Sequence, residues 1–287
     1  MSHPTKKYSK KPEWLKVKLP GGDNFKKLRD IVEDRKLHTI CTSGRCPNMG
    51  ECWNDGTATF LILGNICTRS CGFCNVLTGK PLPADLEEPH KIAKSIQLMG
   101  VKHAVITSVD RDDLPDGGSE IWAETVNAIR KLNPDVTLET LIPDFQGKTK
   151  LLDNIVSVSP EVVSHNLETV RRLTKQVRKQ AKYERSLEVL KYLKNQGINR
   201  TKSGLMLGLG ETETEVIESM QDLRKVNVDI ITIGQYLQPS PKHLPVDRYV
   251  TPVEFKKYEI IGLEMGFKHV ESGPLVRSSY HAHKHIL

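Results

Sequence analysis

The chain contains the stretch Ala58-Thr-Phe-Leu-Ile-Leu-Gly64-Asn-Ile-Cys67-Thr-Arg-Ser-Cys71-Gly-Phe73-Cys74, and this stretch decides the fold. Its first part, Ala58 to Gly64, is apolar, rich in β-forming residues and bounded by glycine. Such a run predicts a buried strand, here the first strand of a parallel barrel. The second part places three cysteines with the spacing C-x3-C-x2-C on the loop that follows this strand.

Short β-type runs alternate with longer helical patterns along the rest of the chain, as a parallel β/α arrangement requires. The predicted strands are Phe60–Leu63, Ala104–Val109, Thr137–Ile142, Val162–His165, Gly204–Leu207 and Ile230–Tyr236. The predicted helices are Asn24–Leu37, Pro89–Met99, Gly118–Leu132, Lys148–Val156, Glu184–Gln196, Glu213–Val226 and Pro252–Met265. Six strands predict an α/β fold, a partial (β/α)6 TIM-type barrel with N-terminal and C-terminal extensions.

Composition limits the class of protein. The 287 residues, 38% of them hydrophobic, suffice for one large core, although two modest domains are also possible. The chain lacks an apolar run long enough to span a bilayer, and its start is too polar for a signal peptide. We therefore expect a cytoplasmic protein, or one in an equivalent reducing compartment, that does not associate with membranes.

The net charge is +7, and the basic residues gather in two segments, Lys6 to Lys16 and Arg171 to Arg185. These segments either attract an acidic partner or form a solvated tail and a solvated helix face. Nucleic-acid binding is not expected, because no recognition motif and no basic groove studded with aromatic residues accompanies the charge.

All six cysteines lie between positions 41 and 74. A disulfide framework suits small secreted domains, so metal binding is the better interpretation for a large chain without a secretory signal. Two triplets are present: Cys41, Cys46 and Cys52, and Cys67, Cys71 and Cys74. Three thiolates can hold an iron–sulfur cube with one iron left open, whereas structural zinc usually takes four ligands. Two cubane clusters are thus favoured, with a zinc loop as the alternative for the first triplet.

Both triplets resemble known motifs. The second triplet, with Phe73 before its last cysteine, resembles the radical S-adenosylmethionine superfamily, in which the open iron chelates S-adenosylmethionine and a 5′-deoxyadenosyl radical is released. The segment Cys41-Thr-Ser-Gly-Arg-Cys46-Pro-Asn-Met-Gly-Glu-Cys52-Trp resembles the auxiliary-cluster motif of the lipoyl synthase family. The resemblance implies two [4Fe–4S] clusters, one on each triplet, and S-adenosylmethionine.

The end of the chain, Gly273-Pro-Leu-Val-Arg277-Ser278-Ser279-Tyr280-His281, resembles the terminal Arg-Ser-Ser-Tyr motif of the same family. The resemblance implies that a serine oxygen, from Ser279 rather than Ser278, completes the auxiliary cluster. From the residues alone a polar tail is the alternative. We expect the two histidines beyond it, His283 and His285, to be solvated rather than ligating.

Polar residues after the predicted strands are candidates for binding S-adenosylmethionine, because barrel enzymes keep their chemistry on these loops. The resemblance points to Asp116, Gly117, Gly118, Glu139, Asn166 and Glu168, in addition to Phe73. A glycine turn with a helix-capping acid is the alternative for residues 116–118. His165 is expected to be a satisfied pocket histidine. The segment 235–249 is expected to close the barrel mouth over an acyl chain, with an ordinary connecting loop as the alternative.

The resemblance implies a sulfurtransferase that inserts sulfur at C6 and C8 of an octanoyl group on a lysine of a lipoyl domain. Implied partners are octanoylated E2 subunits and the glycine cleavage H protein, a ferredoxin or flavodoxin, and iron–sulfur carrier proteins. We expect an extension over residues 1–56 with the auxiliary ligands, a barrel over 57–268 and a serine-bearing extension over 269–287. The alternatives are another sulfur-inserting radical enzyme, of the biotin synthase or methylthiotransferase kind, and a zinc-binding interaction module.

Overall fold

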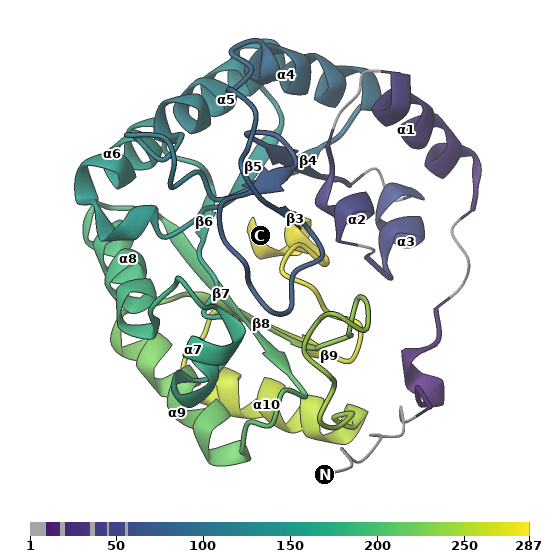
Figure 1. Ribbon diagram of the computed structural model, residues 1–287, viewed down its shortest axis with the longest axis vertical. Helices are drawn as coiled ribbons and strands as arrows, with labels where there is room; N and C mark the ends of the chain where they lie inside the picture. Colours follow the sequence, from purple (N-terminus) through teal and green to yellow (C-terminus); the bar gives the residue numbers. More distant parts are fainter. Residues whose placement is uncertain (1–9, 18–20, 35–37, 45, 55–56, 287) are drawn as a thin grey trace.

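The computed structural model describes residues 10–17, 21–34, 38–44, 46–54 and 57–286. Seven parallel strands form one sheet in the order β1-β4-β5-β6-β7-β8-β9, and helices cover its outer face (Figure 1). The strands are β1 Thr59–Ile62, β4 His103–Ser108, β5 Thr137–Leu141, β6 Val162–Ser164, β7 Arg200–Leu207, β8 Ile230–Gln235 and β9 His269–Gly273. Because β1 and β9 stand at the two ends of this order, the barrel is partial.

Helices α4 Glu88–Met99, α5 Ser119–Leu132, α6 Thr149–Val158, α8 Tyr183–Asn195, α9 Glu213–Lys225 and α10 Pro252–Glu264 cover the sheet. Local sequence sets where they begin. At α9 and α10 a threonine and the glutamate three residues later form a capping box, which satisfies free amide groups at the helix start. The central strands are buried almost throughout, since parallel strands covered by helices have no solvated face.

The six predicted strands are confirmed, and each observed strand overlaps its predicted range. The prediction nevertheless missed β9, which pairs in parallel with β8. It also missed the two-residue strands β2, Ile66–Cys67, and β3, Leu77–Thr78, which form a separate small sheet. The sequence of β9, His269-Val-Glu-Ser-Gly273, has a single fully buried residue, Val270, so it lacks the apolar run that predicts a strand. The division of the chain into three parts stays a prediction, with residues 269–273 inside the sheet.

The N-terminal segment packs beside β1. Helix α1, Asp23–Asp34, confirms the predicted helix over its described part, and residues 35–37 of that prediction lie outside the described residues. The Phe25 ring lies 5.4 Å from the Trp53 ring at the end of α3, Met49–Asn54. Thr39 pairs with Phe60 in an antiparallel bridge. These contacts hold the first cysteine triplet against the barrel wall.

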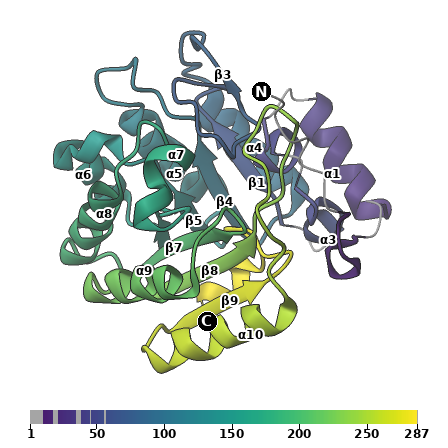
Figure 2. The ribbon, with the colours of Figure 1, turned by 60° about the horizontal axis from the view of Figure 1, so that its bottom comes forward.

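The C-terminal segment returns through the ring of strands, where Figures 1 and 2 show it in yellow. It ends in a 3-10 helix, Ala282–Ile286, that contacts β4. None of the helices formed by the described residues is long and apolar enough to cross a membrane.

Candidate cluster and cofactor site

A cavity of about 540 Å³ opens at the carboxyl ends of the strands, and all six cysteines line it. The two triplets are separated in sequence by β1, and the fold brings them to one space. The barrel mouth is the usual place for catalytic groups in this architecture. The cysteines are free thiols, which agrees with metal binding rather than a disulfide framework.

The second triplet lies on the loop that begins at β2, Ile66–Cys67, directly after β1. Backbone amides position the first thiol: Cys67 Sγ accepts from Arg69 N at 3.4 Å and from Asp110 N at 3.3 Å. Thr68 N donates to Asp110 O at 3.1 Å, and Gly72 N donates to Val177 O at 2.9 Å. The loop is therefore held by backbone contacts to two neighbouring segments before any metal binds.

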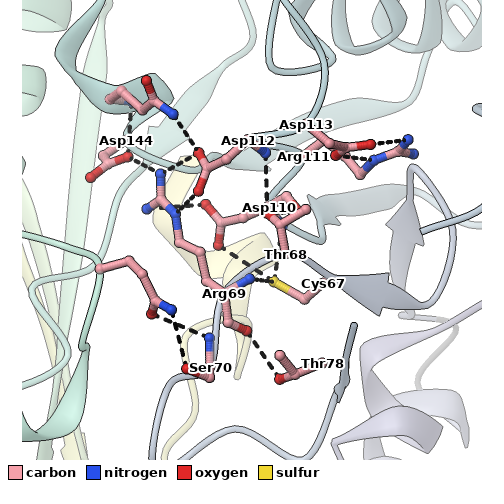
Figure 3. Close-up of polar contacts among 12 residues, drawn as sticks. Cys67, Thr68, Arg69, Ser70, Thr78, Asp110, Arg111, Asp112, Asp113 and Asp144 are labelled. Atoms are coloured by element: carbon pink, nitrogen blue, oxygen red, sulfur yellow. Dashed lines mark hydrogen bonds and ion pairs between the residues drawn. The ribbon is translucent and has the colours of Figure 1, made fainter. Parts of the chain in front are cut away.

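The Arg69 side chain points from the same loop toward three carboxylates, those of Asp110, Asp112 and Asp144 (Figure 3). Its guanidinium is 2.6 Å from Asp112, 2.7 Å from Asp144 and 3.2 Å from Asp110, and the residue is 5% exposed. Burial opposes ionisation of Asp144, yet Arg69 holds the pKa of that carboxyl well below its usual range. Burial raises the pKa of Asp110 to about 6, and Arg69 acts against that rise. This ion network was not predicted, because no sequence signal pairs residues so far apart.

The first triplet is built on two short helices. Thr39 caps α2, Ile40–Ser43, by accepting from Thr42 N, and this helix carries Cys41. Cys46 N donates to Cys41 O, and Cys52 N donates to Asn48 O, each at 2.9 Å. The Asn48 side chain donates to Leu275 O at 2.7 Å, so the triplet is joined to the C-terminal segment.

Burial makes these thiols hard to ionise in the protein alone. It raises the pKa of Cys41 and Cys67 to about 11 and that of Cys52 and Cys71 to about 12. Neighbouring thiols of the same triplet raise the pKa of Cys52 further. Thiolates packed this closely need a cation to hold their charge. The donor set, three thiols in each of two groups, fits two [4Fe–4S] clusters with one iron of each left for another ligand.

The terminal motif reaches the cavity. Ser278, Ser279 and Tyr280 line it together with Arg277, whose charge interacts with Cys46. Asn166 Nδ2 donates to Ser278 Oγ at 2.7 Å, whereas Ser279 Oγ has no hydrogen bond to any described residue. The Ser279 hydroxyl is therefore free to act as a ligand in the cavity that both triplets line.

The predicted contacts of S-adenosylmethionine divide into two groups. Phe73, Asn166 and Glu168 line the cavity. Glu168 adopts φ 65°, which is uncommon for a residue with a side chain, and such strain concentrates at functional sites. Burial raises the pKa of its carboxyl, and the nearby Arg178 opposes this rise.

Asp116, Gly117, Gly118 and Glu139 do not line the cavity, so their positions do not support the predicted contacts. Asp116 accepts from Gly118 N and Glu120 N, each at 3.1 Å, and so caps α5. Gly118 is left-handed, and a β-carbon there would lie 2.5 Å from the Leu63 side chain. These residues fit the alternative of a glycine turn with a capping acid.

Glu139 lies in the middle of β5 and points into the barrel rather than to its mouth. Both of its oxygens contact Lys202 Nζ, at 2.8 and 2.9 Å, and neither side chain is exposed. The attraction of Lys202 holds the pKa of Glu139 at about 2 against the effect of burial. Its role in the described structure is an internal ion pair.

Two further predictions concern the mouth. His165 has both ring nitrogens occupied, at 2.9 Å from Ile142 O and 2.9 Å from Ser186 Oγ, as expected of a satisfied pocket histidine. The segment 235–249 packs over the second triplet: His243 Nε2 donates to Cys74 O at 2.9 Å, and Leu244 N donates to Gly72 O at 3.0 Å. Its contact with an acyl chain stays a prediction.

Comparisons with known proteins agree with this site. The family model of the radical SAM superfamily matches residues 61–223, and that of the N-terminal domain of lipoyl synthase matches residues 2–46. Among solved structures, SuiB of Streptococcus suis superposes with a TM-score of 0.60 at 11% identity, over 86% of this chain and 52% of that chain. HydG of Carboxydothermus hydrogenoformans gives 0.56 at 16% identity, over 80% and 65%. At such identities these structures support the fold alone.

Relatives in sequence are much closer. The lipoyl synthase of Flavobacterium psychrophilum is 71% identical over 96% of both chains. The mitochondrial lipoyl synthase of Nematostella vectensis is 71% identical over 96% of this chain and 95% of its own. With two three-thiol groups and a free serine hydroxyl in one barrel cavity, the chain belongs to the lipoyl synthase family of the radical S-adenosylmethionine superfamily.

Proposed function

We propose that this chain converts an octanoyl group, carried on a lysine of a lipoyl domain, to a lipoyl group by inserting sulfur at C6 and C8. The observation that carries the proposal is the meeting of both cysteine triplets and the Ser278-Ser279 segment in one cavity. A single acyl chain can reach two cluster sites only if both open into the same space. Proximity of this kind lowers the barrier of a step between two bound groups.

In this proposal Cys67, Cys71 and Cys74 hold one [4Fe–4S] cluster, and Cys41, Cys46, Cys52 and Ser279 hold the other. Together with S-adenosylmethionine these groups would supply a carbon radical that removes hydrogen from the unactivated C6 methylene and C8 methyl groups, and the sulfide that takes its place. The protein itself positions the groups that hold the clusters and shields the reacting carbon atoms from water and oxygen. Contacts of Arg69 and of the 235–249 segment support the second triplet, and the tail carries Ser279 into the cavity that the first triplet also lines.

The cavity also suits an apolar chain. Its lining includes the apolar side chains of Leu61, Val109, Leu141, Ile142, Leu205 and Val276 in addition to the two cysteine groups. An octanoyl chain buries its methylenes favourably in such surroundings. An enclosed site also keeps water and oxygen away from a reactive carbon centre.

The basic segment 171–185 offers a surface for the protein partners that this function requires. Three lysines of this segment are exposed and form no ion pair with described residues: Lys175, Lys179 and Lys182. Between them, Gln180 forms hydrogen bonds with Ser70 on the loop of the second cysteine triplet. Arg171 and Arg172 of the same segment are engaged by Glu184, Asp222 and Glu215. A lysine surface beside the cavity mouth suits an acidic partner.

We propose octanoylated E2 subunits and the glycine cleavage H protein as substrates, a ferredoxin or flavodoxin as electron donor, and iron–sulfur carriers as cluster donors. Free cysteines are kept reduced in the cytoplasm or an equivalent compartment, which is where we place the chain.

The test is anaerobic incubation of the cluster-loaded protein with dithionite, S-adenosylmethionine and an octanoyl-lysine peptide, followed by mass spectrometry. We expect a dithiol or lipoyl product. The variant C41A/C46A/C52A is the matched control: it should still form 5′-deoxyadenosine and leave the octanoyl group without sulfur. If wild type forms 5′-deoxyadenosine but never alters the peptide, the substrate assignment fails. If the protein holds zinc and no acid-labile sulfide, the interaction module is correct instead.

A further inference from the structure

Three side chains of metal-binding type meet at the amino ends of the strands, away from the cavity. One potential ligand atom from each of His269, Glu271 and His285 lies within 4.8 Å of the others. His269 and Glu271 alternate on β9, so they project from the same face of the sheet. His285 comes from the C-terminal 3-10 helix, and its ring lies 4.6 Å from the ring of His269.

His285 was expected to be solvated, and the structure corrects this: the residue is 2% exposed. Its Nδ1 lies 3.1 Å from Lys202 Nζ, which can only donate, so Nδ1 accepts and the proton of the neutral ring is on Nε2. That Nε2 is buried without a hydrogen-bond partner among the described residues. Buried polar groups are nearly always paired, so an orphaned imidazole nitrogen beside a histidine and a carboxylate needs an explanation.

We propose that His269, Glu271 and His285 form a binding site for a divalent transition-metal ion of the zinc type, which joins β9 to the C-terminal tail. Two imidazoles and one carboxylate are a ligand set that zinc takes readily, whereas calcium and magnesium prefer oxygen ligands alone. No cysteine belongs to this set, so the site is separate from both thiol groups.

The surroundings of His285 can accommodate the ion. Coordination by Nε2 would move the ring proton to Nδ1. The Lys202 ammonium, 3.1 Å from Nδ1, would then have to turn away, and Glu139 Oε2, 3.9 Å from Nδ1, would have to approach to accept the proton. A carboxylate behind a metal-bound histidine is the usual outer partner of such sites. Lys202 keeps its two contacts to Glu139 and balances that charge. On the other side, His281 Nδ1 lies 3.5 Å from Glu271 Oε1 and orients the carboxylate.

The experiment is equilibrium dialysis of the cluster-loaded enzyme against micromolar Zn²⁺ under anaerobic conditions, with zinc and iron measured together. We expect one zinc per chain with the iron content unchanged. His269→Gln and His285→Gln should each weaken zinc binding at least tenfold. His283→Gln, a change at another histidine of the same tail, should leave it unchanged. A zinc-edge anomalous difference peak between His269, Glu271 and His285 in a soaked crystal locates the ion.

Three results overturn the proposal: no zinc at micromolar concentration, equal zinc in wild type and both variants, or zinc that replaces iron in proportion and therefore sits on the thiols. Circular dichroism checks that the variants fold. If His285→Gln unfolds the chain, His269→Gln and Glu271→Gln carry the test, because both side chains are partly exposed.

Discussion

The side-chain amide of Asn166, on the loop after β6, donates a hydrogen bond of 2.7 Å to the hydroxyl of Ser278. The same amide also donates to Glu168 at 2.9 Å, so Ser278 is tied to the strained residue of the cavity wall. The next hydroxyl, that of Ser279, has no such tie within the described chain. The two adjacent serines thus differ: the Ser278 hydroxyl is hydrogen-bonded within the described chain, and the Ser279 hydroxyl is not.

Ser279→Ala should therefore reduce the lipoyl product by at least about tenfold, because a metal site that loses a ligand is weakened by about that factor or more. Formation of 5′-deoxyadenosine should continue, since the second triplet is untouched. Ser278→Ala is the matched control, and it removes one hydrogen bond worth about 1 kcal/mol. Mass spectrometry of peptide and nucleoside measures both. A larger loss of product in Ser278→Ala than in Ser279→Ala would reverse the assignment.

Arg69→Met should destabilise the protein by about 3 kcal/mol, because it leaves Asp110 without its ion-pair partner and Asp144 with Arg185 alone. Urea unfolding, followed anaerobically by circular dichroism, measures the change. Lys91→Met removes an exposed cation paired with Asp85 and should leave the midpoint unchanged. Equal midpoints for Arg69→Met and wild type would show that the network contributes no stability.

Lys202→Met should cost about 3–5 kcal/mol of unfolding free energy, because Glu139 is left charged in the barrel interior. The double variant Lys202→Met with Glu139→Leu should recover most of this loss, since two apolar side chains replace an ion pair of similar volume. The comparison uses urea midpoints of the single and double variants. If the double variant is as unstable as the single one, the pair has a role beyond mutual neutralisation.

Gly234→Ala should displace the tail that carries Ser279. A β-carbon on Gly234 would lie 2.1 Å from the carbonyl oxygen of Val276, a backbone atom that cannot rotate away. We expect lower lipoyl product, with iron retained on the second triplet. Gly79→Ala, where the nearest atom would be 3.4 Å away on the Ile66 side chain, is the tolerated control. Full activity in Gly234→Ala would mean that the tail position is not critical.

Alkylation of Cys67 by iodoacetamide in the metal-free protein should be about 100-fold slower than in the unfolded chain near pH 8. Burial and the charge of Asp110 raise the pKa of Cys67 from 9.0 to about 11, and the thiolate is the reacting form. Because only the thiolate reacts, the alkylation rate of Cys67 should increase with pH until the pH reaches the raised pKa of about 11. Mass spectrometry of the labelled peptide at several pH values measures the profile. A plateau near pH 9 would show that the thiol is not buried as described.

Much of the fold was predictable because its signals are local. Apolar runs between glycines predicted six strands, and the spacing of six cysteines predicted two metal sites. β9 was not predicted because most of its residues are only partly buried, so its sequence has no alternation of apolar and polar residues that would distinguish it from a polar tail. Glu139 was misplaced because a strand pattern does not say whether a side chain faces the mouth or the interior of a barrel.

The chain's sequence by itself determined six of the seven strands of the main sheet and the helices between them, the two groups of three thiols and the Ser278-Ser279 motif, because each depends on neighbours within a few residues. Only the tertiary structure decided that both thiol groups face one cavity. It also decided that Asn166 hydrogen-bonds Ser278 and not Ser279, and that Arg69, Lys202 and His285 are buried. These outcomes depend on contacts between residues far apart in the sequence. They matter for stability because burying a charge or an imidazole costs free energy unless another residue pairs with it, and here that residue comes from a distant part of the chain.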